Sequence, residues 1–501
     1  MERIGIIDIG SNSIRLVIIA IKANRAHHLI ENLKRTVRLR SGVDQGGLLT
    51  QQGIDNAVET VALFAKFCQA RQVKRIIAAA TAAVRQAANA HVLVERIFQE
   101  TGIQVQVLSG EEEAYLGYIG LVNSVTETTG LMADLGGGSL KLVGFVDRLN
   151  RHSVTLEFGA VSLMEKYSLS DLPQAENLQA FEAFLDESFS QIPWLAEYPR
   201  VIGIGGTFRS LARVYRNHVH YVPDLTDGIT IPTAKVEELY HLLSTMPLEQ
   251  RRQVPGLEQA RADLIVTGLG IIYRLLKAAR SPEVMVSASS IRDGLFFRYL
   301  YPRDPILFNV LTHHTNNLIE YHNLDENHLR RVSNLAVTLF DQLAPLHGLG
   351  SLERRLLLMA SLLHELGVVV SVESLEKHTL YTVLNSRFLG LAHRERVLVA
   401  YLAASHDRPF RANLMDYVNH GPLVPEDLDL LKKLTPLLQV AHSLDRSRAG
   451  VVTHVKADLS PGRCELKVFG PRKRDLEISD ASRHAPAFEQ EYGVQLVVLP
   501  G

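Results

Sequence analysis

Two stretches of the sequence decide the fold: Asp8-Ile9-Gly10-Ser11-Asn12-Ser13 and Asp134-Leu135-Gly136-Gly137-Gly138-Ser139. Each follows a short apolar run and precedes another, so each predicts two strands joined by a tight turn. A turn built from Gly and Ser exposes backbone N–H groups and lets an oxyanion approach the chain. The aspartate that ends each first strand can hold a hard cation such as Mg²⁺. Two copies therefore predict two similar lobes whose turns face each other across a cleft suited to a phosphate chain.

The composition is that of an ordinary globular protein. The chain has 501 residues, 46% hydrophobic and 21% charged, which is enough for three or four domains. Its net charge of −1 gives no overall basic field, so we expect no nucleic-acid partner and a purely local anion site. Two distant cysteines favour a reducing, cytoplasmic location. No run of 18 apolar residues occurs, so no membrane span is expected.

The pattern of apolar residues divides the chain into four parts. Strands and helices alternate up to about Val122, and the strand–turn–strand unit starts again near Gly130, followed by a long helix predicted over Glu258–Ala279. The prolines in Tyr301-Pro302-Arg303-Asp304-Pro305 mark a boundary. Beyond it the pattern is almost wholly helical to Ala449, and strand-like alternation ends the chain. The predicted domains are residues 1–124, 125–303, 304–449 and 450–501.

Further segments follow these motifs in a fixed order: Gly10 to Leu16, Ala80 to Asn89, Ser109 to Ala114, Gly205-Gly206-Thr207, Arg261-Ala262-Asp263 and Ile291-Arg292-Asp293-Gly294. Together they closely resemble the exopolyphosphatase / guanosine pentaphosphate phosphohydrolase family, from Met1 to about Leu300, and the helical region resembles its long form. The resemblance implies a phosphohydrolase with two ribonuclease-H-like α/β lobes of the actin-like ATPase superfamily. An all-α HD-like domain and a small α/β C-terminal module would follow. No Walker-type GxxxxGK[ST] occurs, so a P-loop enzyme is not expected.

The resemblance also implies roles for particular residues. Glu113 would be the general base, and Arg85 would clamp phosphate, although an arginine at such a place also suits a surface salt bridge. Glu111 and Glu112 are interpreted as an acidic first turn that suits the helix dipole. The expected metal ligands are Asp134, then Asp8, with Glu113 beside them. The expected phosphate-binding residues are Gly10, Ser11, Asn12, Ser13, Gly136, Gly137, Gly138, Ser139, Lys141, Gly206 and Thr207.

One departure from the family pattern concerns the second turn. Where the family commonly has Gly-Gly-Gly-Ser-Thr-Glu, this chain has Gly136-Gly137-Gly138-Ser139-Leu140-Lys141. A hydroxyl and a carboxylate are lost and a cation is gained. We expect a weaker metal site, with direct contact between Lys141 and phosphate or a reduced turnover. Arg292-Asp293-Gly294 in place of Arg-Glu-Gly is a milder change.

The helical region carries histidines that resemble the metal ligands of HD-type phosphohydrolases. They are His328, His364 with Glu365, His378, His406, and His442 with Asp445. The doublet is His-Glu in place of His-Asp, and many of the 20 histidines are structural. Imidazoles and carboxylates from several helices can bind a divalent metal. We interpret the region as a scaffold for a dimer and a polymer channel, with a metal site as the alternative.

The predicted function is that of an exopolyphosphatase, which releases terminal orthophosphate from inorganic polyphosphate with Mg²⁺ or another divalent cation. The predicted assembly is a homodimer. Hydrolysis of guanosine pentaphosphate (pppGpp) in the same site is the second candidate. Two rivals belong to other classes: an actin-like ATPase or kinase, and a catalytically weak polyphosphate- or (p)ppGpp-binding regulator.

Overall fold

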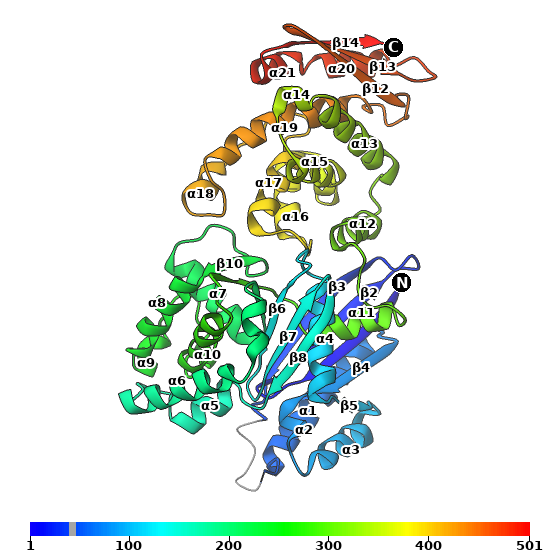
Figure 1. Ribbon diagram of the computed structural model, residues 1–501. Coiled ribbons are helices and arrows are strands. Elements are labelled where there is room, and N and C mark those ends of the chain that lie inside the picture. The colour runs from blue at the N-terminus through cyan, green and yellow to red at the C-terminus, as the bar shows by residue number, and fades with distance from the viewer. Residues whose placement is uncertain (40–46) are drawn as a thin grey trace. The chain divides into compact units, whose positions relative to one another are not determined.

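The computed structural model describes residues 1–39 and 47–501. The chain forms two compact units, Met1–Val310 and Leu311–Gly501, each described by itself below (Figure 1). The predicted boundary between residues 303 and 304 falls in the segment between helices α11 (Ile291–Leu300) and α12 (Val310–His322).

The first unit begins with a five-stranded sheet in the order β3-β2-β1-β4-β5. Strands β1, β2 and β3 pair antiparallel, and β1, β4 and β5 pair parallel. The sheet is covered on both faces, which explains why the apolar residues of β1 form a nearly continuous run. The strands are β1 (Glu2–Ile9), β2 (Ser13–Ile21), β3 (His27–Thr36), β4 (Arg75–Ala80) and β5 (Val105–Val107). The helices are α1 (Gln51–Ala70), α2 (Ala82–Arg85), α3 (Ala90–Thr101) and α4 (Gly110–Val122).

A six-stranded sheet follows in the order β10-β11-β9-β6-β7-β8. Its strands are β6 (Gly130–Leu135), β7 (Leu140–Val146), β8 (Leu149–Leu156), β9 (Val201–Ile204), β10 (Ile229–Pro232) and β11 (Glu283–Val286). Five of them repeat the order and directions of the first sheet, and β10 is added at the edge. The helices are α5 (Ala160–Tyr167), α6 (Ala175–Ser190), α7 (Gly206–His218), α8 (Thr233–Ser244), α9 (Leu248–Arg251), α10 (Ile265–Ala278) and α11. The prediction of two similar α/β lobes is confirmed.

The two predicted turns are closed by the same backbone hydrogen bond. Gly10 N donates to Ser13 O at 3.2 Å, and Gly136 N donates to Ser139 O at 3.0 Å. The register across each hairpin is also the same, because Asp8 faces Arg15 and Asp134 faces Lys141. The repeat therefore includes a carboxylate and a cation on neighbouring strands.

Helix α4 packs between the two sheets. Leu116 and Ile119 join the core beside β1, whereas Tyr118 and Leu121 join the core beside β6 and β7. All residues from Leu116 to Val122 are buried, whereas Glu111, Glu112 and Tyr115 are exposed. The packing of α4 against both cores therefore sets the place of Glu113 at its start.

One helix boundary was predicted wrongly. The helix expected over Glu258–Ala279 begins only at Ile265, after a short 3₁₀ turn at Gln259–Arg261. The carbonyl of Ala262 accepts a hydrogen bond at 3.0 Å from Arg251 Nη1. That tertiary bond keeps the segment before Ile265 out of the helix.

The second unit is helical up to Ser443 and ends in a three-stranded sheet. Its further helices are α13 (Glu326–Gln342), α14 (Ala344–His347), α15 (Ser351–Leu363), α16 (Leu375–Asn385), α17 (His393–Ala404), α18 (Leu414–Asn419), α19 (Glu426–Ser443), α20 (Asp475–Ser482) and α21 (Ala485–Tyr492). The sheet has the order β12-β13-β14, built from His454–Ser460, Arg463–Phe469 and Gln495–Pro500. One hydrophobic core contains residues of both parts, such as Leu335 and Val468. The C-terminal module therefore shares its core with the helices.

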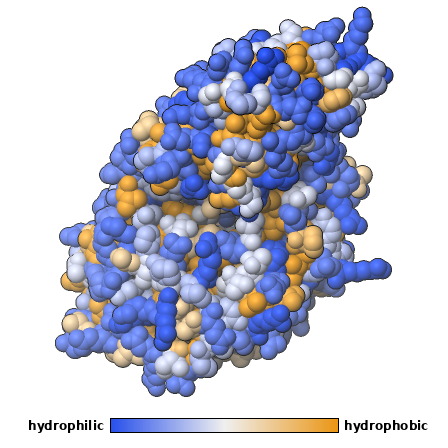
Figure 2. Space-filling model, turned by 45° about the horizontal axis from the view of Figure 1, so that its top comes forward, coloured by the Kyte–Doolittle hydropathy of each residue, from blue (hydrophilic) through white to orange (hydrophobic). Residues whose placement is uncertain are grey.

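The outer surface carries mostly polar residues on the face shown in Figure 2, with hydrophobic residues scattered among them. Scattered apolar side chains of this kind are normal on a protein surface. Within residues 1–39 and 47–501, none of the helices has both the length and the apolar character needed to cross a membrane.

Candidate active site

A cavity of about 150 Å³ lies in the first unit, where the two glycine turns meet. A Cβ built on Gly137 would lie 3.4 Å from Ser11 Cβ, so the two turns approach each other closely. Most of the residues predicted for the site lie in its wall: Asp8, Gly10, Ser11, Asn12, Ser13, Glu113, Asp134, Gly136, Gly137, Gly138, Ser139, Lys141 and Gly206. Residues from both repeats and from α4 therefore surround one space.

Two glycines allow the backbone to close around this cavity. Gly205 has φ of +99°, and a Cβ there would lie 2.8 Å from Leu135 O. A Cβ on Gly159 would lie 2.6 Å from Gly136 O, because the N-terminus of α5 sits directly on the second turn. Ala160 N donates to Gly136 O at 3.1 Å and Val161 N to Gly137 O at 2.8 Å. These bonds tie the carbonyls of Gly136 and Gly137 to the start of α5.

The carboxylate of Glu113 is buried at the start of α4. Its Oε2 accepts from Arg85 Nη1 at 2.9 Å, and its Oε1 accepts from Lys141 Nζ at 2.5 Å. Glu112 closes a capping box with Ser109, with both bonds near 3 Å, so its side chain serves the helix end. Of the three glutamates, Glu113 is the one in the cavity wall.

Arg85 and Thr207 lie outside the residues that line the cavity. Arg85 contacts Glu113 from outside the cavity wall, and its Nη1 also donates to Leu108 O at 3.0 Å. Its Nη2 is buried and has no hydrogen-bond partner among the described residues. In this arrangement Arg85 positions Glu113, and its role as a phosphate clamp stays a prediction. Thr207 is buried against Gly268 of α10, where a Cβ on the glycine would lie only 2.3 Å from Thr207 Cγ2.

Lys141 is buried with an exposed fraction of 2%, between carboxylates of both lobes. It faces Asp134 across the hairpin and reaches Glu113 on α4. Its counterpart in the first hairpin is Arg15, which faces Asp8. The departure from the family pattern thus makes the two halves of this chain more alike, and it places a lysine amino group beside the expected base.

The carboxylates in the wall offer the hard oxygen atoms that Mg²⁺ prefers. Both oxygens of Glu113 already accept from cations, and Asp8 Oδ2 accepts from Arg292 Nη1 at 2.6 Å. Burial, outweighing the nearby Lys141, raises the pKa of Asp134. A cation beside its carboxylate would favour the charged form. The donor set fits Mg²⁺ held by Asp134 together with substrate oxygens, a mode common for this ion.

Four arginines that the sequence analysis did not select also line the cavity: Arg15, Arg209, Arg261 and Arg292. Burial and the other three arginines lower the pKa of Arg209, and its Nη1 has no hydrogen-bond partner in the described chain. The guanidinium of Arg261 packs directly on Gly206, where a Cβ would lie only 2.2 Å from Arg261 Nη2. Lys141 and the four arginines therefore outnumber the three carboxylates in the wall, which favours the binding of an anion.

The positions of these arginines were visible in the sequence. Arg15 lies seven residues after Asp8, as Lys141 does after Asp134, and Arg209 follows the Gly205-Gly206-Thr207 turn. Arg261 and Arg292 belong to two of the segments that carry the family resemblance, but no role was predicted for either residue. A search for cations at the same distance from each aspartate would have found Arg15 as the counterpart of Lys141.

The fold and the cavity define a two-lobed α/β protein with a cationic site between its lobes. Residues 17–302 match the Ppx/GppA phosphatase family, and residues 311–474 match domain III of that family. The chain belongs to the Ppx/GppA phosphatase family, as its sequence motifs predicted.

Individual relatives agree with this assignment. A guanosine-5′-triphosphate,3′-diphosphate pyrophosphatase of Pseudoalteromonas atlantica is 25% identical over 449 residues, 87% of this chain and 84% of that protein. The structure of an exopolyphosphatase from Cytophaga hutchinsonii is 26% identical, with a TM-score of 0.57 over 61% of this chain and 99% of the other. An Aquifex aeolicus family member is 28% identical, with a TM-score of 0.54 over 60% and 99%.

Proposed function

We propose that this phosphatase removes the terminal phosphoryl group of inorganic polyphosphate and releases orthophosphate. The observation that carries the proposal is the cavity itself, where Glu113 faces two glycine turns and four arginines. Cleavage of a phosphoanhydride needs little covalent chemistry from the protein. It depends on positioning and on positive charge around the spreading oxyanions.

In the proposed reaction, a water molecule attacks the terminal phosphorus while the bond to the bridging oxygen breaks. Glu113 orients that water and accepts its proton, and the shortened chain leaves with the electron pair of the broken bond. Ser139 Oγ is buried without a hydrogen-bond partner among the described residues, so it is available to donate to a phosphate oxygen. Arg209 and its neighbours would hold the equatorial oxygens.

Asp134 is the residue best placed to hold Mg²⁺ together with oxygens of the phosphate chain. The ion would neutralise charge on those oxygens. Lys141 supplies a fixed charge in the same region, and an incoming phosphate competes with Glu113 for its ammonium. Transfer of Lys141 from Glu113 to the phosphate would free Glu113 Oε1 for the water.

Hydrolysis of pppGpp is the second candidate, favoured by the name of the Pseudoalteromonas relative. The terminal phosphate of pppGpp presents the same anhydride to the same side chains. None of the described residues in the cavity wall is aromatic, so this wall offers no stacking surface for a base. That favours recognition of the phosphate chain alone.

A catalytically weak binder remains the third candidate, because Lys141 occupies the expected base. The homodimer and the cytoplasmic location stay predictions from the sequence.

A phosphate-release assay on the purified chain with Mg²⁺ separates these candidates. The panel contains long-chain polyphosphate, pppGpp and ATP at equal concentrations of terminal phosphate. We expect the highest kcat/KM with polyphosphate, a lower value with pppGpp and the lowest with ATP. Highest activity with pppGpp would establish the second candidate, and tight binding of polyphosphate without release would establish the third. Highest activity with ATP would contradict all of them.

A further inference from the structure

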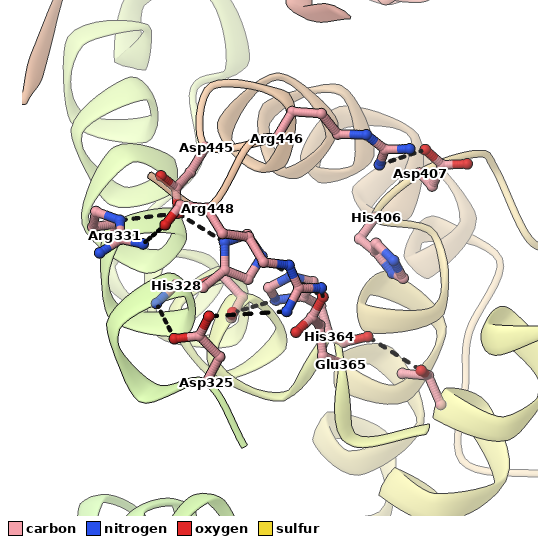
Figure 3. Close-up of polar contacts among 12 residues, drawn as sticks. Asp325, His328, Arg331, His364, Glu365, His406, Asp407, Asp445, Arg446 and Arg448 are labelled. Atoms are coloured by element: carbon pink, nitrogen blue, oxygen red, sulfur yellow. Dashed lines mark hydrogen bonds and ion pairs between the residues drawn. The ribbon is translucent and has the colours of Figure 1, made fainter. Parts of the chain in front are cut away.

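Four of the five histidines noted in the sequence, His328, His364, His406 and His442, form one buried cluster in the second unit. Figure 3 shows the first three of them. One ligand atom each from His328, His364, Glu365 and His442 lies within 4.8 Å of the others. Their exposed fractions are 1%, 0%, 4% and 6%. His378 is not part of this group.

The second nitrogen of two rings is already occupied, in the way expected of metal-binding imidazoles. His328 Nδ1 bonds to Asp445 Oδ2 at 2.8 Å, and His364 Nδ1 bonds to Ser361 O at 2.7 Å. Because a backbone carbonyl only accepts, Nδ1 of His364 carries the proton and Nε2 keeps its lone pair. Nε2 of both rings is buried without a hydrogen-bond partner in the described parts of the chain. Two bare acceptors in one buried cluster are costly unless a cation meets them.

Three helices, α15, α17 and α19, have their C-terminal ends at this histidine cluster. His364 caps the C-terminus of α15, and His442 lies in the last turn of α19. His406 follows the end of α17. A helix C-terminus carries partial negative charge and favours a cation.

We infer that His328, His364, Glu365 and His442 form a binding site for a first-row transition-metal dication such as Zn²⁺. Three imidazoles and one carboxylate favour such an ion over Mg²⁺ or Ca²⁺, which prefer oxygen ligands. Ligand atoms on one ion lie at most about 4.2 Å apart, twice a typical metal–nitrogen distance, so the side chains need to move inward only slightly. Four protein ligands, all buried, make a closed site of the structural kind. The ion would tie together α13, α15 and α19.

Arg448 is the present counter-ion of Glu365. It donates to Glu365 Oε1, the oxygen that lies 3.7 Å from His328 Nε2, and its own side chain is 48% exposed. A metal ion and this guanidinium would compete for the same carboxylate. Replacement of Arg448 should therefore strengthen metal binding, whereas a purely structural ion pair would predict only a loss of stability.

The test uses the full chain, with any affinity tag removed, after chelator treatment and reconstitution with Zn²⁺. We expect about one tightly held ion per chain by elemental analysis and a raised melting temperature, since an ion that binds only the folded state stabilises it. Mg²⁺ added in excess should displace neither the bound zinc nor the thermal shift that zinc produces, because this site offers mainly imidazole ligands. A wild-type chain that retains no zinc above a blank and shows no thermal shift would overturn the inference.

Variants distinguish this site from adventitious binding. His364→Gln and His442→Gln should lose the ion, whereas His378→Gln, the histidine that the geometry excludes, should keep it. Asp445→Asn should weaken binding about 10–100-fold by loosening His328, and Asp407→Asn, which pairs with Arg446 at 3.5 Å, is its matched control. Arg448→Met should bind Zn²⁺ at least as tightly as wild type, and this variant stays informative if the histidine variants misfold. Equal loss in His378→Gln, or weaker binding in Arg448→Met, would contradict the assignment.

Discussion

Glu113 shows how one side chain can depend on both lobes. It starts a helix packed between the two sheets, and its two carboxylate oxygens accept from Arg85 of the first lobe and Lys141 of the second. The position of the carboxylate is therefore fixed by charge as well as by packing. A residue that orients water benefits from such fixed geometry, because misplacement lowers the rate steeply.

Replacement of Glu113 by Gln should reduce the rate of phosphate release by about 10²–10⁴-fold, the usual contribution of a general base. The amide keeps the shape of the side chain, so polyphosphate affinity should change little. The measurement is kcat by phosphate release together with Kd by equilibrium binding. Glu111→Gln, on an exposed residue two positions earlier in the same helix turn, is the control and should behave as wild type. Near-normal turnover in Glu113→Gln would remove Glu113 from the mechanism.

Arg209 lies among three other arginines, and its buried Nη1 has no hydrogen-bond partner among residues 1–39 and 47–501, an arrangement that favours anion binding at some cost in stability. We expect Arg209→Met to raise the melting temperature of the ligand-free protein by relieving repulsion between like charges. The same variant should lose most of the thermal shift that polyphosphate produces in wild type. Thermal unfolding with and without polyphosphate measures both effects. An unchanged polyphosphate shift would show that Arg209 does not bind the chain.

At the scale of elements, the strand–turn–strand unit explains why the fold could be predicted from sequence. The turns need small residues and the strands need apolar ones, so both requirements are visible as a local pattern. The pairing of Asp134 with Lys141 and of Asp8 with Arg15 was missed. The equal spacing of each cation from its aspartate is visible in the sequence. That each cation faces its carboxylate depends on the register across the hairpin, which the spacing alone does not give.

The start of α10 and the histidine cluster show a second limit of the sequence. A tertiary hydrogen bond from Arg251 moved the helix start to Ile265, and no local signal encodes that bond. Four of the five histidines named from the sequence lie in the cluster. Only the packing of α13, α15 and α19 shows that His378 lies outside it and that two Nε2 atoms have no hydrogen-bond partner in the part of the chain that the structure describes.

The β6–β7 hairpin allows a prediction for a variant that restores the family pattern at residues 140 and 141. Leu140→Thr combined with Lys141→Glu replaces the buried ammonium by a third carboxylate beside Asp134 and Glu113. We expect a higher affinity for Mg²⁺ and faster Mg²⁺-dependent release of phosphate, because three carboxylates can share one divalent ion. Without Mg²⁺ the variant should be less stable than wild type, since the carboxylates repel one another.

A Mg²⁺ titration of phosphate release checks this prediction. Lys141→Met is the control, because it removes the ammonium without adding a carboxylate. A lower rate than wild type at every Mg²⁺ concentration in the double variant would show that the Lys141 ammonium itself acts on the substrate.

At the scale of the whole molecule, the two units carry two different ligand chemistries. The first unit presents arginines and glycine turns suited to a phosphate chain. The second presents imidazoles suited to a transition metal. Each ligand should therefore stabilise its own unit, because a ligand stabilises the part of the protein that binds it.

Hydrogen exchange of the full chain tests this division. Polyphosphate should slow exchange in residues 8–15, 134–141 and 205–213, and Zn²⁺ should slow exchange in residues 326–332, 361–366 and 440–446. Protection by Zn²⁺ confined to the first unit would contradict the division, as would protection by polyphosphate confined to the second.

The central claim is that the cavity removes phosphate from the end of a polyphosphate chain. The most direct measurement is a time course of long polyphosphate with the purified chain and Mg²⁺, resolved by chain length, with free orthophosphate determined in parallel. The account predicts that the polymer shortens while orthophosphate is the only small product, and that Glu113→Gln stops both changes. An unchanged polymer, or fragments of intermediate length from internal cleavage, would contradict it.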